Sequence, residues 1–379
     1  MRMNDQLRPP IFPRWSRPRA VTIVVATAPP KPKRRVLRQR RARTTLLMGL
    51  FAFLALQLVL AVGVAQGRWK LHDTIFVNKK QLLDDHLAST PEATRLLVMG
   101  SSRVLFGVDA KQINESMRDD GIDAFNFGIA AAGPLTQMVY LERLLDGGWK
   151  PNIVAIEVLP AMFAQSATPF ESKWLKSSRL TADERVVVSA CGMVVDQGET
   201  RVHRWLAPSL VHRVGILRRV WPEMLGSEDR IDGHNVSDSH GFARSSIVSV
   251  TPEQYVKGVA GAGRTYQPYL EKVSIGNPGR AAFERMLTRC RLEGIRVVVF
   301  VMPEAPEFQA FYGAGFRSEL DQYLSRARSE FDYDWIDARD WLPADAFHDG
   351  HHLIASGAAR MSERFAKELR SILRAGDRP

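Results

Sequence analysis

The chain has 379 residues, enough for one large domain or two smaller ones, and its composition is that of a globular protein, with 45% apolar and 25% charged residues. Its formal net charge is +11, a balance typical of proteins that bind nucleic acid. The charge is concentrated at one end, because residues 1–44 contain thirteen lysines and arginines but a single acid and so carry +12. Residues 45–379 therefore carry −1, which disfavours a folded domain that binds nucleic acid.

The basic segment, residues 1–44, also contains seven prolines. Proline interrupts helices, and this segment lacks the apolar residues needed for a core, so we expect a disordered tail. The next stretch, LLMGLFAFLALQLVLAVGVA at 46–65, has Gln57 as its only clearly polar residue. Because twenty apolar residues in a helix cross the hydrocarbon core of a bilayer, we predict a transmembrane helix over residues 45–66.

The charge beside this helix predicts its orientation. Lysine and arginine are retained on the cytoplasmic side, so we expect a single-pass protein of the cell (inner) membrane with a cytoplasmic N-terminus and a periplasmic, extracytoplasmic body. A cleavable signal peptide is the competing interpretation, since Gly63–Ala65 resembles a cleavage site, but the apolar region is long for that role. Because the membrane already explains the basic flank, we expect no nucleic-acid partner.

Beyond a predicted linker at 67–93, short apolar runs that end at turn residues predict strands. These runs lie at 96–99, 124–127, 152–160, 294–304 and 332–339. Residues at helical spacing lie between them at 108–121 and 135–148, and a last helix is predicted from Ser356. Alternating strands and helices predict a parallel sheet covered by helices on both faces, over residues 94–375.

A long insertion at about 161–275 separates the third strand from the fourth and carries few strand signals. Within it, residues 202–225 mix bulky apolar residues with histidines and arginines, which predicts an amphipathic helix pair interrupted at Pro208. Such a pair either lies on a membrane surface or covers the sheet with its basic face in water, and the second is favoured. The polar residues 226–241 predict a flexible loop.

The two cysteines leave two alternatives open. Cys191 and Cys290 either pair in an oxidising compartment or are buried as single apolar residues.

Polar and small residues follow the first two strands, where a parallel α/β sheet binds its ligands. Ser101 and Ser102 lie in a strand-to-helix turn, which presents a hydroxyl beside the amides of a helix N-terminus. Serines in such turns also act simply as helix caps. The second strand runs into NFGIAAAGP, Asn126–Pro134, whose small residues either admit a substrate to backbone amides or allow tight helix packing.

The stretch FHDGHHLIASGA at 347–358 follows the fifth strand and contains three histidines and an aspartate within five positions. Asp349 stands three residues before His352, so one helical turn brings the carboxylate beside the imidazole. A carboxylate in this position holds the tautomer whose other ring nitrogen takes a proton from a serine.

Together these three blocks resemble the SGNH hydrolase superfamily, which has a serine block after the first strand, a glycine block after the second and an Asp-x-x-His block before the last helix. The resemblance covers roughly residues 94–160 and 290–375 and implies a flavodoxin-like three-layer α/β/α domain of SGNH type. It implies Ser102 as nucleophile, His352 as general base and acid, and Asp349 as orienting carboxylate. It also implies an oxyanion or substrate site formed by the Ser102 amide and by Ser101, Asn126, Gly128, Ala131 and Gly133.

Two blocks depart from the usual family pattern. GSSR at 100–103 replaces Gly-Asp-Ser, as in branches that modify extracellular glycans and teichoic acids. The block Gly-x-Asn-Asp after the third strand, whose asparagine donates to the oxyanion, is replaced by IEVLPAMF with Glu157 and Leu159. Because loss of one such donor lowers the rate about a hundredfold or more, the gap suits a weak enzyme, a transferase of altered geometry or an inactive relative.

A metal site is the main alternative for the histidine-rich stretch. Histidines four residues apart can chelate an ion together with nearby carboxylates, and the chain offers His348, His352, Asp349, His351, Glu304 and Glu307. Chelation by such a pair calls for a helix, and Gly350 interrupts one. The catalytic pair is therefore favoured, and neither a metal ion nor another cofactor is expected. A polar turn without function is the third alternative.

The resemblance to anchored members of the superfamily implies a serine O-acyl(acetyl)transferase or esterase that acts on a cell-envelope or secreted polysaccharide. The partners it implies are a glycan substrate, the membrane and a multi-spanning membrane protein that supplies the acyl group. The alternative function is a catalytically inactive SGNH-fold envelope protein that binds glycan or a membrane partner, consistent with the missing asparagine.

Overall fold

A computed structural model describes residues 33–66, 73–89, 93–164, 168–194, 207–225, 237–270, 275–276 and 278–376. Contacts divide the chain within its first helix into two compact units, Met1–Leu54 and Ala55–Pro379.

The first helix, α1 (Lys33–Gln66), contains the predicted span. Its stretch Arg38–Gly63 has a mean hydropathy of 2.4 over 26 residues, so it is long and apolar enough to cross a membrane. Membrane anchors and signal sequences share such a composition. The part of the predicted disordered tail at 33–44 is helical, because it follows the last proline, Pro32, and consists mostly of good helix formers. Residues 1–32 lie outside the described residues.

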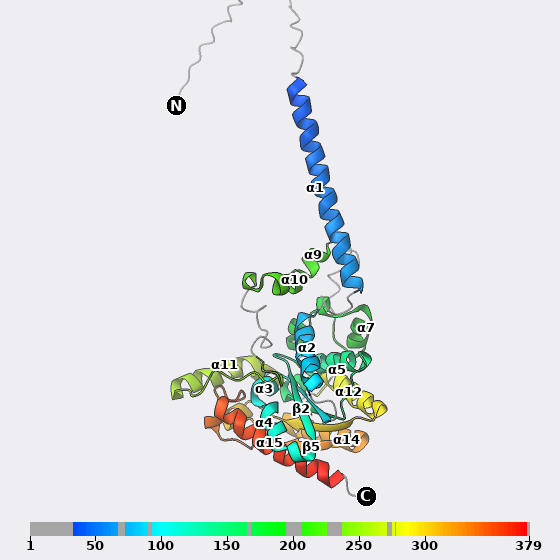
Figure 1. Ribbon diagram of the computed structural model, residues 1–379. Coiled ribbons are helices and arrows are strands. Elements are labelled where there is room, and N and C mark those ends of the chain that lie inside the picture. Colours follow the sequence, from blue (N-terminus) through cyan, green and yellow to red (C-terminus); the bar gives the residue numbers. More distant parts are fainter. Residues whose placement is uncertain are drawn as a thin grey trace, which may run out of the picture. The chain divides into compact units, whose positions relative to one another are not determined.

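All five predicted strands form one parallel sheet in the order β2-β1-β3-β4-β5 (Figure 1). They are β1 (Thr94–Gly100), β2 (Ile122–Gly128), β3 (Ile153–Glu157), β4 (Arg296–Val301) and β5 (Asp334–Asp337). This is the flavodoxin-like order, in which the chain reverses its direction of progress across the sheet between β1 and β3. Residues that follow β1 and β2 therefore meet at one rim of the sheet.

Helices cover both faces of the sheet, so the predicted three-layer α/β class is confirmed (Figure 1). Alternate residues of β1 show the division, because Leu97 and Met99 belong to one buried cluster while Leu96 and Val98 belong to the other. The first cluster includes residues of α2 (Thr74–Ser89), α5 (Pro134–Asp146), α12 (Gly279–Glu293) and α14 (Phe316–Phe331). The second includes residues of α3 (Ser102–Gly107), α4 (Ala110–Ser116) and α15 (Ala355–Gly376).

Shorter helices join these elements. They are η1 (Arg118–Asp120), η2 (Pro160–Phe163), α13 (Pro306–Gln309) and η7 (Ala344–Ala346).

Helix α2 occupies the segment predicted as a linker, 67–93, and in its described part that segment belongs to the domain. Phe76 and Leu83 are two helical turns apart, so they lie on the same face of α2, and both are buried in the first cluster. Asp73 caps the helix by accepting from the amide of Phe76 at 3.2 Å. Burial alone would raise the pKa of Asp73, but Arg179 and Arg143 outweigh it and hold that pKa well below its usual range.

The described residues of the insertion are mainly helical, as predicted. They form α6 (Thr168–Trp174), η4 (Ser177–Arg179), α7 (Ala182–Ala190), α9 (Pro208–Val211), α10 (Arg213–Val220), η5 (Pro222–Met224) and α11 (Pro252–Leu270). The predicted break at Pro208 is instead the first residue of α9, because proline fits the first turn of a helix. The helices α9 and α10 join at His212.

The insertion returns along the rim of the sheet. The carbonyl of His240 accepts from Asn126 N at 2.9 Å, Ala243 N donates to Leu105 O at 3.0 Å, and Ala355 N donates to Ile247 O at 3.2 Å. Part of the predicted flexible loop, residues 237–241, is therefore held by backbone hydrogen bonds, and 226–236 lie outside the described residues. Both cysteines, Cys191 and Cys290, are free and buried, so the single apolar reading holds.

Replacement of Phe76 by alanine tests the place of α2 in the core. Phe76 is fully buried, and its ring centroid lies 5.0 Å from that of Tyr140, so we expect the free energy of unfolding to fall by about 3–5 kcal/mol. Gln81→Ala, at an exposed position of the same helix, is the matched control and should change it by less than about 0.5 kcal/mol. Urea denaturation measures the free energy of unfolding of both variants. Equal changes in the two would contradict the packing of α2 against the core.

Candidate active site

Ser102 is the first residue of α3, at the rim where β1 ends. Ser101 before it caps the helix, because its Oγ accepts from the amide of Arg103 at 3.1 Å. The turn is tight, since a side chain at Gly100 would meet Val104 Cγ2 at 2.3 Å and Glu157 Oε2 at 2.5 Å. Of the two predicted serines, Ser101 therefore serves the helix and Ser102 keeps its hydroxyl for another partner.

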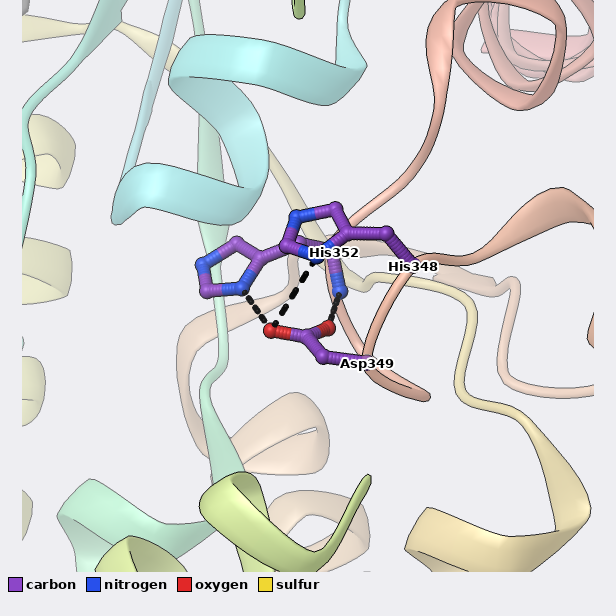
Figure 2. Close-up of side chains that lie close together, drawn as sticks. All are labelled: His348, Asp349 and His352. Carbon is purple, nitrogen blue, oxygen red and sulfur yellow. Dashed lines mark hydrogen bonds and ion pairs between the residues drawn. The ribbon is translucent and has the colours of Figure 1, made fainter. Parts of the chain in front are cut away.

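That partner is His352, whose Nε2 lies 2.8 Å from Ser102 Oγ across 250 positions of sequence. Its other ring nitrogen, Nδ1, lies 2.8 Å from Asp349 Oδ2 (Figure 2). The structure thus brings together the three side chains predicted as nucleophile, base and orienting acid. Both contacts have hydrogen-bond length, and the carboxylate can only accept, so the contact places a proton on Nδ1 and leaves Nε2 to accept from the serine.

Asp349 and His352 approach each other through a tight hairpin, where the sequence predicted a helical turn. Phe347 and Leu353 form an antiparallel bridge, and His348 N donates to His352 O at 3.0 Å. Gly350 sits at the tip with φ +86°, a conformation that favours glycine. Asp349 Oδ1 accepts from the amides that follow it, His351 N at 3.1 Å and His352 N at 2.8 Å.

The carboxylate of Asp349 stays ionised although it is mostly buried. Burial alone would raise its pKa, but hydrogen bonds from His351 and His352 and the charge of these imidazoles outweigh burial and hold the pKa of Asp349 well below its usual range. An ionised carboxylate stabilises the imidazolium that forms when His352 takes up a proton.

Asn126, predicted at the oxyanion or substrate site, is instead a buried structural residue. Its Nδ2 donates to Val104 O at 2.8 Å and Val108 O at 2.6 Å, and its Oδ1 accepts from Gly128 N at 2.8 Å. The side chain therefore ties the chain after β1 to the end of β2. Since the Gly128 amide is used in this contact, neither residue has a donor left for a substrate.

Gly133 is also engaged within the protein. Its amide donates to Glu171 Oε1 at 3.0 Å, and the same oxygen accepts from Thr136 N at 2.8 Å. Glu171, on α6, thus caps the N-terminus of α5 with a carboxyl group, although burial raises the pKa of Glu171 to about 7. The predicted role of the Gly133 amide as a substrate donor is contradicted by this contact.

Ala131 remains from the predicted loop. It has φ 60°, a left-handed conformation that is unusual for a residue with a side chain, and it is partly exposed. Among the described residues, no acceptor is found for the amide of Ala131 or for that of Ser102. Ser102 N belongs to the turn after β1, and Ala131 N to the loop after β2.

Glu157 is the last residue of β3, after which SGNH hydrolases usually have the Gly-x-Asn-Asp block. Its Oε2 accepts from Ser101 N at 2.6 Å, and its Oε1 lies 3.5 Å from Arg103 Nε. Burial raises the pKa of Glu157 despite the charge of Arg103 beside it. The glutamate thus supports the serine turn from below and donates nothing to an oxyanion.

Arg103 is a residue of the GSSR block that sequence reasoning passed over. Its guanidinium is buried and donates to Glu304 Oε1 at 3.0 Å, Met302 O at 2.8 Å and Pro303 O at 3.1 Å. An arginine within the first turn of an otherwise apolar helix was the available signal. Glu304 therefore belongs to this ionic network, and Glu307 accepts from Tyr255 OH at 2.9 Å. Neither of these predicted metal donors joins the histidines, and the described residues place only His348, Asp349 and His352 in one group that can hold an ion.

His351, between Asp349 and His352, packs inward. Its ring stacks on that of Phe308, with centroids 4.8 Å apart and planes at 25°, and meets Tyr266 of α11 edge-on at 5.1 Å. Its Nδ1 lies 3.2 Å from Asp349 Oδ1, and among the described residues neither ring nitrogen has a hydrogen bond of regular geometry. Burial lowers the pKa of His351 to about 4, so the ring is neutral at neutral pH.

Helix α11 of the insertion lies directly against the hairpin. A side chain at Gly258 would meet His348 O at 2.6 Å and Asp349 Cα at 3.1 Å, so the helix approaches the loop as closely as its backbone allows. The insertion, to which the sequence assigned no part, therefore forms one wall of the candidate site.

Comparisons with known proteins give family models and solved structures that the chain is similar to. A family described as "Protein of unknown function (DUF1574)" matches residues 44–186, and a second model without a description matches 280–374. No curated protein has significant sequence similarity to the chain. Similar solved structures include several described as esterases.

Three of these structures illustrate the likeness. TesA is 12% identical, with 73% of this chain and 98% of TesA covered and a TM-score of 0.34. Est24, a carbohydrate acetylesterase from Sinorhizobium meliloti, is 14% identical, with 74% and 100% covered and a TM-score of 0.31. Axe2, an acetylxylan esterase from Geobacillus stearothermophilus, is 9% identical, with 73% and 94% covered and a TM-score of 0.34. Likeness this distant carries no argument about activity.

The buried imidazole of His351 predicts a pH dependence of stability. The unfolded chain binds a proton at His351 below about pH 6.5, whereas the folded chain does so only below about pH 4. Stability therefore falls as the pH decreases through this interval, and we expect His351 to account for about 2 kcal/mol of the loss between pH 7 and 5. His351→Phe keeps the aromatic stack without the titration, so urea denaturation should show a smaller loss. The same pH slope in both proteins would contradict the assignment.

Proposed function

We propose that this chain is a membrane-anchored serine O-acyltransferase or esterase whose extracytoplasmic domain acts on acyl esters of a cell-envelope or secreted polysaccharide. The observation that carries the proposal is the chain of two 2.8 Å contacts from Ser102 Oγ through the His352 ring to Asp349 Oδ2. Three residue types in this order and at these distances are the arrangement that activates a serine hydroxyl.

In the proposed first step, Ser102 Oγ attacks the ester carbonyl carbon while His352 Nε2 takes the hydroxyl proton. Asp349 holds the ring and stabilises its positive charge. When the tetrahedral intermediate collapses, His352 returns the proton to the leaving alcohol oxygen and the acyl group stays on Ser102. In the second step, His352 takes a proton from the hydroxyl that attacks the acyl-enzyme, and it returns this proton to Ser102 Oγ as the bond between Oγ and the acyl group breaks.

The amides of Ser102 and Ala131 are the proposed oxyanion donors. Both N–H groups lie at the rim without acceptors among the described residues, and Ser102 N belongs to the turn that carries the nucleophile. Because a side-chain donor of the usual family kind is absent at the end of β3, we expect a rate about a hundredfold below that of an esterase with three donors.

Esterase and transferase differ only in what attacks the acyl-enzyme, water or a sugar hydroxyl. The proposal of transfer rests on the resemblance to anchored members of the superfamily and on the helix α1, which is long and apolar enough to hold the domain at a membrane surface. A multi-spanning membrane protein is then the proposed source of the acyl group. The basic flank of α1 supports a cytoplasmic N-terminus and an extracytoplasmic domain in the cell (inner) membrane.

One observation favours a second function, that of an inactive envelope protein that binds glycan or a membrane partner. Glu157 fills the place of the family asparagine, and the Gly128 and Gly133 amides are bonded within the protein. A fold that keeps the rim but has a weakened oxyanion site suits binding as well as slow catalysis.

Labelling with a fluorophosphonate probe separates the two functions. We expect an adduct on Ser102 in the wild-type protein and none in Ser102→Ala, because the probe reacts only with an activated serine. Ser101→Ala is the matched control, since it removes the neighbouring hydroxyl and lowers stability by about 1 kcal/mol through loss of the helix cap, yet leaves the nucleophile. A folded wild-type protein that takes no label would support the inactive alternative.

Asp349→Asn tests the orienting carboxylate. An amide in place of the carboxylate no longer selects the Nδ1–H tautomer, so we expect kcat/KM for p-nitrophenyl acetate to fall by about 10³–10⁴, as in other serine triads. Asp345→Asn, an exposed acid in the same loop, should retain the wild-type rate. Equal rates in wild type and Asp349→Asn would exclude Asp349 from the mechanism.

A further inference from the structure

His348, Asp349 and His352 form a group of possible metal ligands at the hairpin. His348 is the one member that has no role in the proposed acyl transfer. Its ring lies parallel to that of His352, with planes at 7° and centroids 5.5 Å apart, and its Nδ1 is 3.8 Å from Asp349 Oδ2 (Figure 2). The same Asp349 oxygen accepts from His352 Nδ1 at 2.8 Å. One ligand atom from each of the three residues lies within 4.8 Å of the others.

The hairpin supplies the geometry that a helix was expected to supply. His348 and His352 are paired across it by the bond from His348 N to His352 O at 3.0 Å, so both rings leave the backbone on the same side. Gly350 forms the tip, and α11 packs against His348 O at the position of Gly258. The backbone that carries the three donors is thus held in place by its contact with α11. The donor side chains are partly exposed, which allows an ion to enter from solvent.

Two imidazoles and one carboxylate form a common protein ligand set for Zn²⁺. With metal–ligand distances of about 2.0–2.1 Å, tetrahedral coordination needs donor atoms roughly 3.3 Å apart. The observed separations of 2.8 and 3.8 Å from Asp349 Oδ2 lie on either side of this value. Small side-chain rotations therefore suffice to close the set, with water as the fourth ligand.

We propose that His348, Asp349 and His352 form an inhibitory Zn²⁺ site that competes with the catalytic arrangement. This inference rests on the proposed function for its inhibitory consequence, but metal binding itself does not depend on it. The single ring proton of His352 moves from Nδ1 to Nε2, and zinc bonds to the lone pair that this leaves on Nδ1. The neutral ring then carries its proton on Nε2, which faces Ser102 Oγ and can no longer accept the serine proton. Asp349 exchanges its hydrogen bond for a metal bond.

Cobalt(II) is the probe for the site, because it adopts the coordination of zinc and absorbs visible light when it is bound in a tetrahedral site. The full chain in detergent, freed of metal, is titrated with Co²⁺. We expect one Co²⁺ to bind and Zn²⁺ to displace it, both in the wild type and in Ser102→Ala. Loss of a ligand should weaken binding about tenfold or more in His348→Ala and in His348→Gln, the second variant keeping a polar side chain at the position.

His351→Phe is the matched control, because His351 lies 3.2 Å from Asp349 Oδ1 but outside the donor group, and its ring stacks on Phe308. It should bind Co²⁺ as the wild type does. Absence of Co²⁺ binding in the wild type, or equal binding in both folded His348 variants, would overturn the site.

Inhibition is measured separately, as the Zn²⁺ concentration that halves each protein's own metal-free esterase rate. We expect this concentration to rise about tenfold or more in His348→Gln relative to the wild type. Equal values in the two proteins, or full activity of zinc-loaded wild type, would overturn the inhibitory role. If Ser102→Ala and wild type both bind Co²⁺ but neither hydrolyses esters, the metal site stands and the proposed esterase fails.

Discussion

A single buried cation, the guanidinium of Arg103, holds together the rim on which the candidate site is built. Arg103 follows β1 and meets Glu157 at the end of β3 and Glu304 after β4. A buried guanidinium is tolerated only where its charge and its N–H groups find partners, so the ends of these strands must close around it. Ser102 directly precedes Arg103, and its position above the sheet is set by the same constraint.

Four strands, β1 to β4, could be predicted because each is a mostly buried apolar run, whereas β5 contains two aspartates and has a single buried residue. The contact among Ser102, Asp349 and His352 could be predicted, because each follows a strand and because their sequence blocks resemble those of SGNH hydrolases. Helix α2 was missed because only two of its five buried residues, Phe76 and Leu83, are large and apolar, while Lys79 and His86 are buried although their polarity suggests exposure. Its place in the core depends on packing against α5, as in the contact of Phe76 with Tyr140, and the sequence of α2 alone does not indicate this contact.

The loop after β2 shows a different limit of sequence reasoning. Gly128, Ala131 and Gly133 are equivalent as small residues, and their pattern does not say whose amide is free. Asn126 takes the Gly128 amide and Glu171 takes that of Gly133. The second acceptor comes from the insertion, far along the chain, so the selection is made by tertiary contacts. The hairpin at Gly350 is a similar case, because the Asp-x-x-His spacing fits a helical turn and a hairpin equally well.

The contact between Ser102 and His352 has a consequence for the timing of synthesis. The serine leaves the ribosome long before its base, and the intervening 250 positions include the whole insertion. Such a contact of high sequence separation forms late, since much of the chain must be ordered before its ends can meet. Until the hairpin that carries His352 has folded onto the rim, a nascent chain therefore lacks the contact that activates Ser102 in the proposed mechanism.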